Sequence, residues 1–252
     1  MKTTNEMLDE LFSKWREDKK KFSCFTKDGL VYKYDANIDI EKAWNESPRR
    51  IAFLLKDQHQ YGGLWDEDIR EWLRGEGSDY EKNRNITGKF IRNIANLFYG
   101  LNNLSRQNDC LLQSIPEEAV KYHFNTVPFA FVECKKMPGS SSVSDKTLRS
   151  YLYYRMEDGT DPLGEELKIL NPNIIVCTNV NIYKKVISLD SENIITFPSP
   201  YTSVSFNKKT KSLIFCSYHP SARKPPNTFY EGVMRHYREG FMKSEYATVP
   251  FI

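Results

Sequence analysis

Several features that mark particular classes of protein are absent from this chain of 252 residues. No apolar run approaches the roughly 18 residues that a membrane-spanning helix needs. The first residues, MKTTNEMLDELF, are polar and acidic, which does not fit a signal peptide. There is neither an internal repeat nor a low-complexity tract. We therefore expect no membrane partner and no secretory leader.

Cysteine is scarce, and its spacing indicates no metal centre. The five cysteines stand far apart, at positions 24, 110, 134, 177 and 216, and no CxxC pair occurs. This spacing favours neither a zinc site nor an iron–sulfur site, so we expect no metal and no cofactor. Cys177 and Cys216 lie in apolar runs and are expected to be small core residues. Such thiols fit a reducing compartment, which predicts a cytoplasmic location.

A strong excess of one charge sign is also absent. Lys and Arg number 36 against 33 Asp and Glu, which gives a formal net charge of +3. This balance does not establish a nucleic-acid partner, because both signs are abundant. Hydrophobic residues make up 40% and charged residues 27%, which is typical of a globular protein.

Short apolar runs alternate with amphipathic segments along the chain. The runs predict strands at 51–55, 129–132, 174–177, 194–197, 202–206 and 213–216. Helical spacing predicts helices at 7–22, 35–44, 66–73, 87–104, 116–122, 144–156, 162–170, 181–187 and 229–241. This alternation is typical of a three-layer α/β/α sandwich with a mostly parallel central sheet. We expect one domain over 1–252, with residues 1–48 as a helical extension at its start.

Polar segments follow three of the predicted strands directly. KDQHQYGG (56–63) follows 51–55, ECKKMPG (133–139) follows 129–132, and SYHPSAR (217–223) follows 213–216. Ligands of open α/β sheets bind beyond the carboxyl ends of the strands. The three segments are therefore expected to meet at one site.

In this order, the three segments resemble motifs of the uracil-DNA glycosylase superfamily, and of its divergent bacterial members above all. The match is carried by HPSAR (219–223), VECKKMPG (132–139) and the polar loop after the first apolar strand. It covers about residues 50–223 as spaced motifs rather than as overall identity. The resemblance implies a glycosylase-like fold and DNA as the partner. It also implies a monomeric, monofunctional enzyme that flips a nucleotide and hydrolyses its N-glycosidic bond with water.

Three catalytic candidates follow from the resemblance. His219 matches a histidine that donates a hydrogen bond to a base carbonyl oxygen as negative charge grows there; its other reading is a histidine that fills a turn. Asp57 and Gln58 lie where the family positions its water with Asp or Asn. The family reads Gly-x-Asp-Pro or Gly-x-Asn-Pro, whereas this chain reads KDQHQ (56–60). Gln58 thus takes the Asp/Asn place and Asp57 precedes it, so both stay candidates, beside the reading of a solvent-facing loop.

Glu133 stands where related sequences carry an Asn that reads the base. An ionised glutamate only accepts hydrogen bonds, so it would receive the exocyclic amine of cytosine and repel the carbonyl of uracil. We therefore expect a modified or damaged cytosine-like base to be preferred over uracil. In the alternative reading, Glu133 pairs with Lys135 or Lys56 and the fold has lost its activity.

Further residues are candidates for contacts with the base and the backbone of DNA. Tyr61, Trp65 and Phe131 could stack on a flipped base, or each could belong to the core. The expected DNA contacts are Lys135, Lys136, Ser141, Ser221, Arg223 and Lys224. Two other functions remain open: a non-catalytic nucleic-acid-binding module on the same scaffold, and a hydrolase of free nucleosides.

Overall fold

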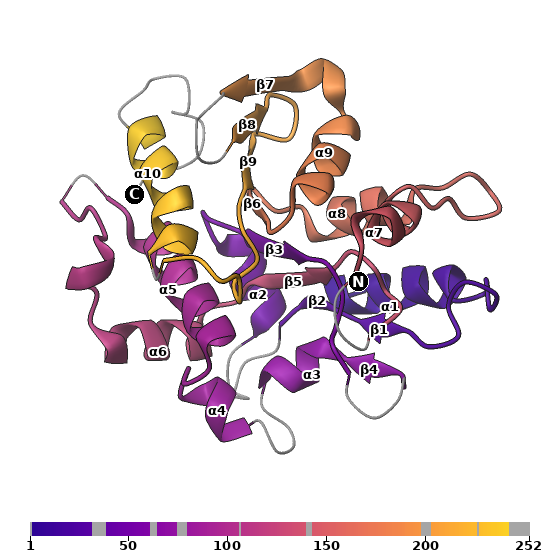
Figure 1. Cartoon of the computed structure of the whole chain (residues 1–252), viewed down its shortest axis with the longest axis horizontal. Coiled ribbons are helices and arrows are strands. Elements are labelled where there is room, and N and C mark those ends of the chain that lie inside the picture. Colours follow the sequence, from indigo (N-terminus) through magenta and orange to yellow (C-terminus); the bar gives the residue numbers. More distant parts are fainter. Residues whose placement is uncertain are drawn as a thin grey trace.

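A seven-stranded mixed sheet lies between two layers of helices in the computed structural model (Figure 1). The structure describes residues 2–31, 39–60, 65–74, 80–105, 107–139, 143–197, 203–225 and 227–241. In spatial order the strands are β2 (Gly29–Leu30), β5 (Ala130–Glu133), β3 (Ile51–Leu55), β6 (Ile174–Cys177), β9 (Ser212–Cys216), β8 (Val204–Asn207) and β7 (Ile194–Phe197). A separate parallel pair joins β1 (Thr26–Lys27) to β4 (Glu67–Asp68).

The expected α/β architecture is confirmed, but the sheet is mixed rather than mostly parallel. Three of its six strand pairs are parallel, and these join the four middle strands β5, β3, β6 and β9. The pairs β2–β5, β8–β9 and β7–β8 are antiparallel. The connection from β8 to β9 spans only residues 208–211, which is too short for the crossover that a parallel pair requires. Sequence periodicity alone does not reveal this reversal.

The middle strands follow the order second, first, third, fourth along the chain. The chain therefore leaves β3 toward one edge of the sheet, to β5, and leaves β6 toward the other edge, to β9. Such a reversal between neighbouring strands opens a crevice at their carboxyl ends, where open α/β sheets bind ligands. The topology thus indicates a ligand site at the loops that follow β3 and its neighbours.

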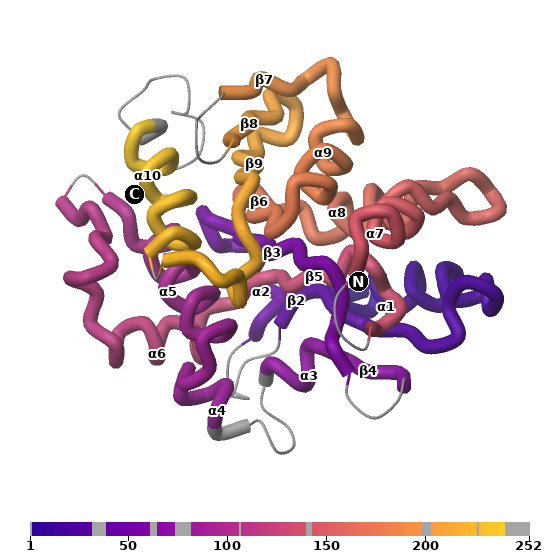
Figure 2. The backbone as a smooth tube through the Cα atoms, in the orientation of Figure 1, coloured from indigo at the N-terminus to yellow at the C-terminus, as the bar shows by residue number. Residues whose placement is uncertain are grey.

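One helical layer packs on the sheet face formed by Phe53, Phe131 and Phe215. Its helices are α3 (Ile69–Arg74), α4 (Tyr80–Arg84), α5 (Lys89–Asn103), α6 (Glu117–Thr126) and α10 (Thr228–Phe241). Helix α5 lies against both α6 and α10 (Figure 2). Its apolar residues recur at helical spacing, and those that face the sheet are fully buried.

The second layer packs on the opposite face, which carries Ala52, Leu54 and Ile214. Its helices are α1 (Thr4–Trp15), α2 (Ile40–Glu46), α7 (Asp145–Leu152), α8 (Pro162–Leu170) and α9 (Val180–Ser188). Two short 3-10 turns, η1 (Leu112–Ser114) and η2 (Ser191–Asn193), complete the described elements. No helix in the described ranges is both long and apolar enough to cross a bilayer.

Within the described part of the first 48 residues, α1 and β2 contribute to this core. Helix α1 begins at a capping box, in which Thr3 and Glu6 exchange hydrogen bonds. Its buried face packs on α8. The same region supplies β2, which extends the sheet beyond β5. The two-residue strand β2 is too short to leave a periodic signal in the sequence.

Candidate active site

The loops after β3, β5 and β9 leave the same edge of the sheet, because these strands run parallel within its middle. Their ends are almost level: Leu55 pairs with Glu133, and Cys177 pairs with Cys216. The three polar segments therefore leave the sheet at one edge, and their meeting at one site stays a prediction.

Backbone hydrogen bonds and an ion pair join the loops after β3 and β5. The Gly139 N–H donates to the carbonyl of Gln58 over 2.8 Å, and the Gln60 N–H donates to the carbonyl of Gly139 over 2.8 Å. Between them, the Lys135 Nζ lies 3.1 Å from Asp57 Oδ2, and these side chains are only 6% and 13% exposed. The two loops thus form one continuous wall of the site.

Asp57 is held by its neighbours, whereas Gln58 is not. A Cβ at position 139 would overlap Asp57 Oδ2, so the close approach of the two loops depends on Gly139. The Lys135 ammonium donates a second hydrogen bond to the Met137 carbonyl over 2.5 Å. Gln58 is half-buried and makes no side-chain hydrogen bond within the part of the chain that the structure describes. The carboxylate is therefore fixed, and the amide is the group that can adjust to a water molecule.

Glu133 is 2% exposed at the end of β5. Its N–H donates to Asp28 Oδ2 over 2.5 Å, and its own Oε2 has no hydrogen-bond partner among the described residues. Burial raises the pKa of Glu133 well above 4.5, and the negative charges of Asp28 and Asp57 raise it further. Burial therefore favours the neutral carboxylic acid over the carboxylate, against the opposing charges of Lys136 and Lys135. The neutral acid donates as well as accepts hydrogen bonds, whereas the expected repulsion of uracil assumed an ionised Glu133; the preference against uracil stays a prediction.

His219 begins a tight turn after β9. The Ala222 N–H donates to the His219 carbonyl over 2.9 Å, with Pro220 in the second position, where its fixed φ favours such a turn. The Ser221 N–H donates to His219 Nδ1 over 3.2 Å. A neutral imidazole that accepts at Nδ1 carries its proton on Nε2, so Nε2 is the nitrogen left to donate.

The surroundings of His219 keep its ring neutral. Burial, and then the positive charge of Lys56, lower the pKa of His219 to about 4. The ring lies 5.7 Å, centroid to centroid, from that of Phe90 on α5, and Phe90 in turn lies 6.2 Å from Phe131. Through these two ring contacts, the loop after β9 is linked to β5, the strand that precedes the second loop.

Phe131 is a core residue, so the prediction that it stacks on a base is wrong. It is 1% exposed and points into the layer of α5, because it shares a sheet face with Phe53. Trp65, by contrast, is 47% exposed, and both its N–H and its carbonyl are bound by the buried amide of Gln60. Trp65 therefore remains a candidate for stacking. Tyr61 lies outside the described residues.

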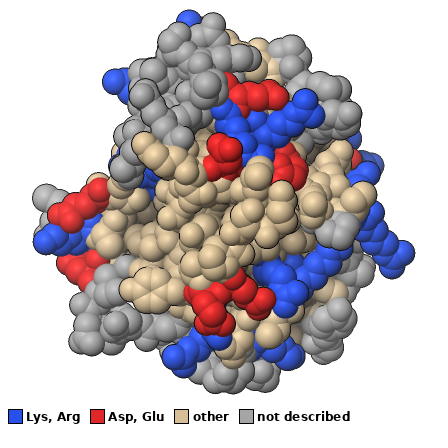
Figure 3. Space-filling view, turned by 90° about the vertical axis from the view of Figure 1, so that its left-hand side faces the viewer, with Lys and Arg blue, Asp and Glu red and all other residues tan. Residues whose placement is uncertain are grey.

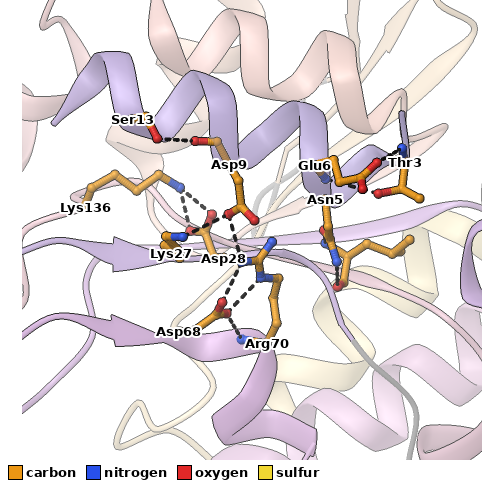
Figure 4. Close-up of polar contacts among 11 residues, drawn as sticks. Thr3, Asn5, Glu6, Asp9, Ser13, Lys27, Asp28, Asp68, Arg70 and Lys136 are labelled. Carbon is orange, nitrogen blue, oxygen red and sulfur yellow. Dashed lines mark hydrogen bonds and ion pairs between the residues drawn. The ribbon is translucent and has the colours of Figure 1, made fainter. Parts of the chain in front are cut away.

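Lys136 lies inside the protein, so the prediction that it contacts DNA is also wrong. Its ammonium is 0% exposed and lies 2.5 Å from Asp28 Oδ2 and 2.9 Å from Glu166 Oε1, which are equally buried. Although burial lowers it, these two carboxylates raise the pKa of Lys136 above 10.5. Figure 4 shows the lysine reaching Asp28 beneath α1, beside a second cluster in which Arg70 binds Asp68.

The remaining predicted DNA contacts differ in exposure. Ser221, Arg223 and Lys224 are exposed on the turn after β9, with the Lys224 ammonium 5.0 Å from the centre of the Tyr218 ring. Lys135 is nearly buried in its ion pair, which places it inside the site rather than on a DNA-facing surface. Ser141 lies outside the described residues. The face on the side of α10 and α6 shows both charge signs around a wide area without charged groups (Figure 3).

The structure adds residues that the sequence did not single out. Phe90 and Asn93, on α5, contact the turn of His219, and their i, i+3 spacing places both on one helix face. That spacing was the available signal, but it is also what any core-facing helix shows. Ser217 directly follows β9, and its Oγ is buried without a partner among the described residues.

A cavity of about 760 Å³ lies away from these strand ends, on the sheet face that α8 and α9 cover. It is bordered by α8, α9 and the turn between β8 and β9, with the ion pair of Lys185 and Asp161 in its wall. None of the predicted site residues lines it. We place the candidate active site at the strand ends, because His219, the buried Glu133 with its unpartnered Oε2 and the Asp57–Lys135 ion pair occur there.

Comparison with known proteins gives no family for this chain. No protein-family model matches the sequence, and no curated protein matches it. In the described ranges, no group of three or more His, Cys, Asp or Glu side chains is arranged to bind a metal ion. The geometry of the site is therefore the basis for the function proposed for this protein.

Proposed function

We propose that the protein is a DNA base glycosylase, which turns a nucleotide out of the stack and hydrolyses its N-glycosidic bond with water. The proposal is carried by one observation: the Ser221 N–H donates to Nδ1 of His219, which leaves Nε2 to donate, at the sheet edge from which Asp57, Gln58 and Glu133 also extend. Cleavage of the bond leaves positive charge on the sugar and negative charge on the departing base. A site for this reaction needs groups that stabilise both charges.

His219 is suited to the departing base. A neutral imidazole that donates from Nε2 stabilises a developing oxyanion without first having to lose or gain a proton. The Ser221 N–H fixes this tautomer by occupying Nδ1. The histidine therefore acts as a hydrogen-bond donor in this scheme rather than as a general base.

Asp57 and Gln58 are suited to the sugar and the water. The Asp57 carboxylate is bound to Lys135 but still 13% exposed, so it can offset part of the positive charge on the sugar. The half-buried amide of Gln58 can orient the attacking water by hydrogen bonds. This division assigns the charge to Asp57 and the placement of the water to Gln58.

Glu133 is suited to reading the edge of the base. Its Oε2 is buried without a partner among the described residues, and a neutral carboxyl pairs one donor with one acceptor. Cytosine offers N4–H and N3, and uracil offers O4 and N3–H; a neutral carboxyl matches either pair when it turns over. The ionised form of Glu133 favours a cytosine-like base over uracil, whereas the neutral form accepts both bases.

A second candidate is a nucleic-acid-binding module without catalysis. The observation that favours it is the Asp57–Lys135 ion pair, which neutralises the carboxylate nearest to the expected water. In this case the exposed Arg223 and Lys224 would bind the phosphate backbone and no bond would break.

The two candidates are separated by an abasic-site assay on single- and double-stranded oligonucleotides that carry uracil, cytosine or modified cytosines. The glycosylase releases at least one of these bases, and His219→Ala lowers the rate about 10²- to 10³-fold, as for loss of one donor to a developing oxyanion. His123→Leu, which removes the other buried neutral histidine, serves as the control with unchanged release. DNA binding without release of any base would replace the glycosylase by the binding module.

A further inference from the structure

The turn that carries His219 is attached to the start of α5 at two points. The Asn93 Nδ2 donates to the Pro220 carbonyl over 2.6 Å, and the Lys89 Nζ donates to the Ala222 carbonyl over 2.9 Å. Both carbonyls belong to the short turn whose first residue is His219. The helix therefore fixes the backbone on both sides of Ser221, the residue whose N–H binds the imidazole.

Phe90 supports the imidazole from the same helix. Its ring plane is tilted by 34° from that of His219, at a centroid distance of 5.7 Å. On the inner side it meets the fully buried Phe131 edge-on. Phe131 is fixed in the sheet. Phe90 packs against it and thereby holds the ring of His219 in place.

We propose that Asn93 and Phe90 are positioning residues of the candidate active site, a role that rests on the proposed glycosylase function. They hold the turn so that the Ser221 N–H stays on Nδ1 of His219 and Nε2 stays available to the base. Neither residue touches the reacting atoms. Their contribution is the orientation and the tautomer of the histidine.

Loss of the Asn93 amide has a defined physical consequence. The Pro220 carbonyl then loses its side-chain donor. Pro220 itself has no N–H that could anchor the turn by a different hydrogen bond. The turn can then move away from α5 and expose the imidazole to water. Since burial is the main cause of the low pKa of His219, exposure raises that pKa from about 4 toward 6.5.

The test compares Asn93→Leu with Asn103→Leu. Asn103 lies on the same helix and donates its amide to the Tyr99 carbonyl over 2.9 Å, but it does not touch the turn. The imidazole nitrogens of His219 are followed by NMR across pH in the free protein, which reports both pKa and tautomer. Base release is then measured with the most reactive oligonucleotide, and kcat and KM are determined separately.

Asn93→Leu is expected to raise the pKa of His219, to mix its tautomers and to lower kcat about 10- to 100-fold with little change in KM, as for a misplaced catalytic group. Asn103→Leu is expected to change none of these, and Asn93→Gln to restore part of the loss. Phe90→Leu, which keeps an apolar side chain against Phe131, is expected to have the same effect in smaller degree.

An unchanged pKa and tautomer of His219 in Asn93→Leu would overturn the positioning role, whatever the activity. The opposite combination is equally informative. A shifted pKa in a protein that releases no base from any substrate would uphold the positioning role and reject the glycosylase instead.

Discussion

Two consecutive lysines, Lys135 and Lys136, follow the end of β5 and have different surroundings. Lys136 is 0% exposed and bound between two carboxylates that are equally buried, Asp28 and Glu166. Lys135 is 6% exposed and bound to a single carboxylate, Asp57, which is itself 13% exposed. The first cluster is closed to solvent, and the second lies at the edge where a ligand can approach.

The difference teaches how a site can be told from a structural ion cluster. Lys136 is bound to Asp28 and to Glu166 of α8 beneath α1. Lys135 is bound to Asp57, in the loop after β3. Exposure separates the two clusters: Asp57, beside Lys135, is 13% exposed, whereas Glu166, beside Lys136, is 0% exposed, although its Oε2 lacks a partner within the described residues just as Glu133 Oε2 does.

The largest expected effect comes from breaking the closed cluster. Lys136→Met leaves Asp28 and Glu166 buried with no cation, and is expected to lower the free energy of unfolding by about 3–5 kcal/mol. Lys135→Met is expected to cost less, because Asp57 can turn toward solvent. Urea denaturation of both variants measures the difference. Equal losses would show that the two lysines have equivalent structural roles.

A smaller effect is expected at the junction of the two loops. Gly139→Ala places a methyl group against Asp57 Oδ2, which must move away from Lys135. We expect a loss of about 1–3 kcal/mol, as for overpacking in a buried region, together with slower base release. Gly88→Ala, at a position with no heavy atom within 4 Å of the added Cβ, is the matched control. A stable and active Gly139→Ala variant would contradict the fixed position of Asp57.

The pH dependence of the free energy of unfolding tests a second pair of residues, His123 and His219. Burial lowers the pKa of His123, on α6, to about 4 from an unfolded value of 6.5. Between these values the unfolded chain binds more protons than the folded one, so stability falls as the pH decreases from about 6.5 to about 4.

Urea denaturation at several pH values measures this slope. His123→Leu is expected to flatten it, because the variant has lost one of the groups that titrate differently in the two states. His219→Ala is expected to flatten it by a similar amount, because the pKa of His219 is also lowered from 6.5 to about 4. An unchanged slope in His123→Leu would refute the assignment of a buried neutral His123.

Much of the fold was predictable, because burial on both faces leaves an unmistakable apolar run. The sequence predicts β3, β6, β7 and α8 with the bounds that the structure has. The segment 66–73 was predicted as one helix, but it begins with β4 and becomes helical only at Ile69. Two-residue strands such as β1, β2 and β4 are held by pairing with distant segments, which local periodicity does not report.

The placement of the candidate residues at strand ends was predictable, but the chemistry of their side chains was not. The order of polar segments placed Asp57, Glu133 and His219 there. The sequence could not show the raised pKa of Glu133, because it depends on burial and on Asp28, 105 positions earlier. Nor could it distinguish Lys135 from Lys136, since the carboxylates that bind each lysine lie on segments distant in the sequence.

The most direct test of the central claim locates the ligand. Amide hydrogen exchange is measured with and without an oligonucleotide that carries an abasic-site analogue. We expect slower exchange in the loops that follow β3, β5 and β9 and in the first turns of α5, with no change around α8 and α9. Slower exchange confined to the cavity beside α8 and α9, with the strand ends unchanged, would contradict the site proposed for this protein.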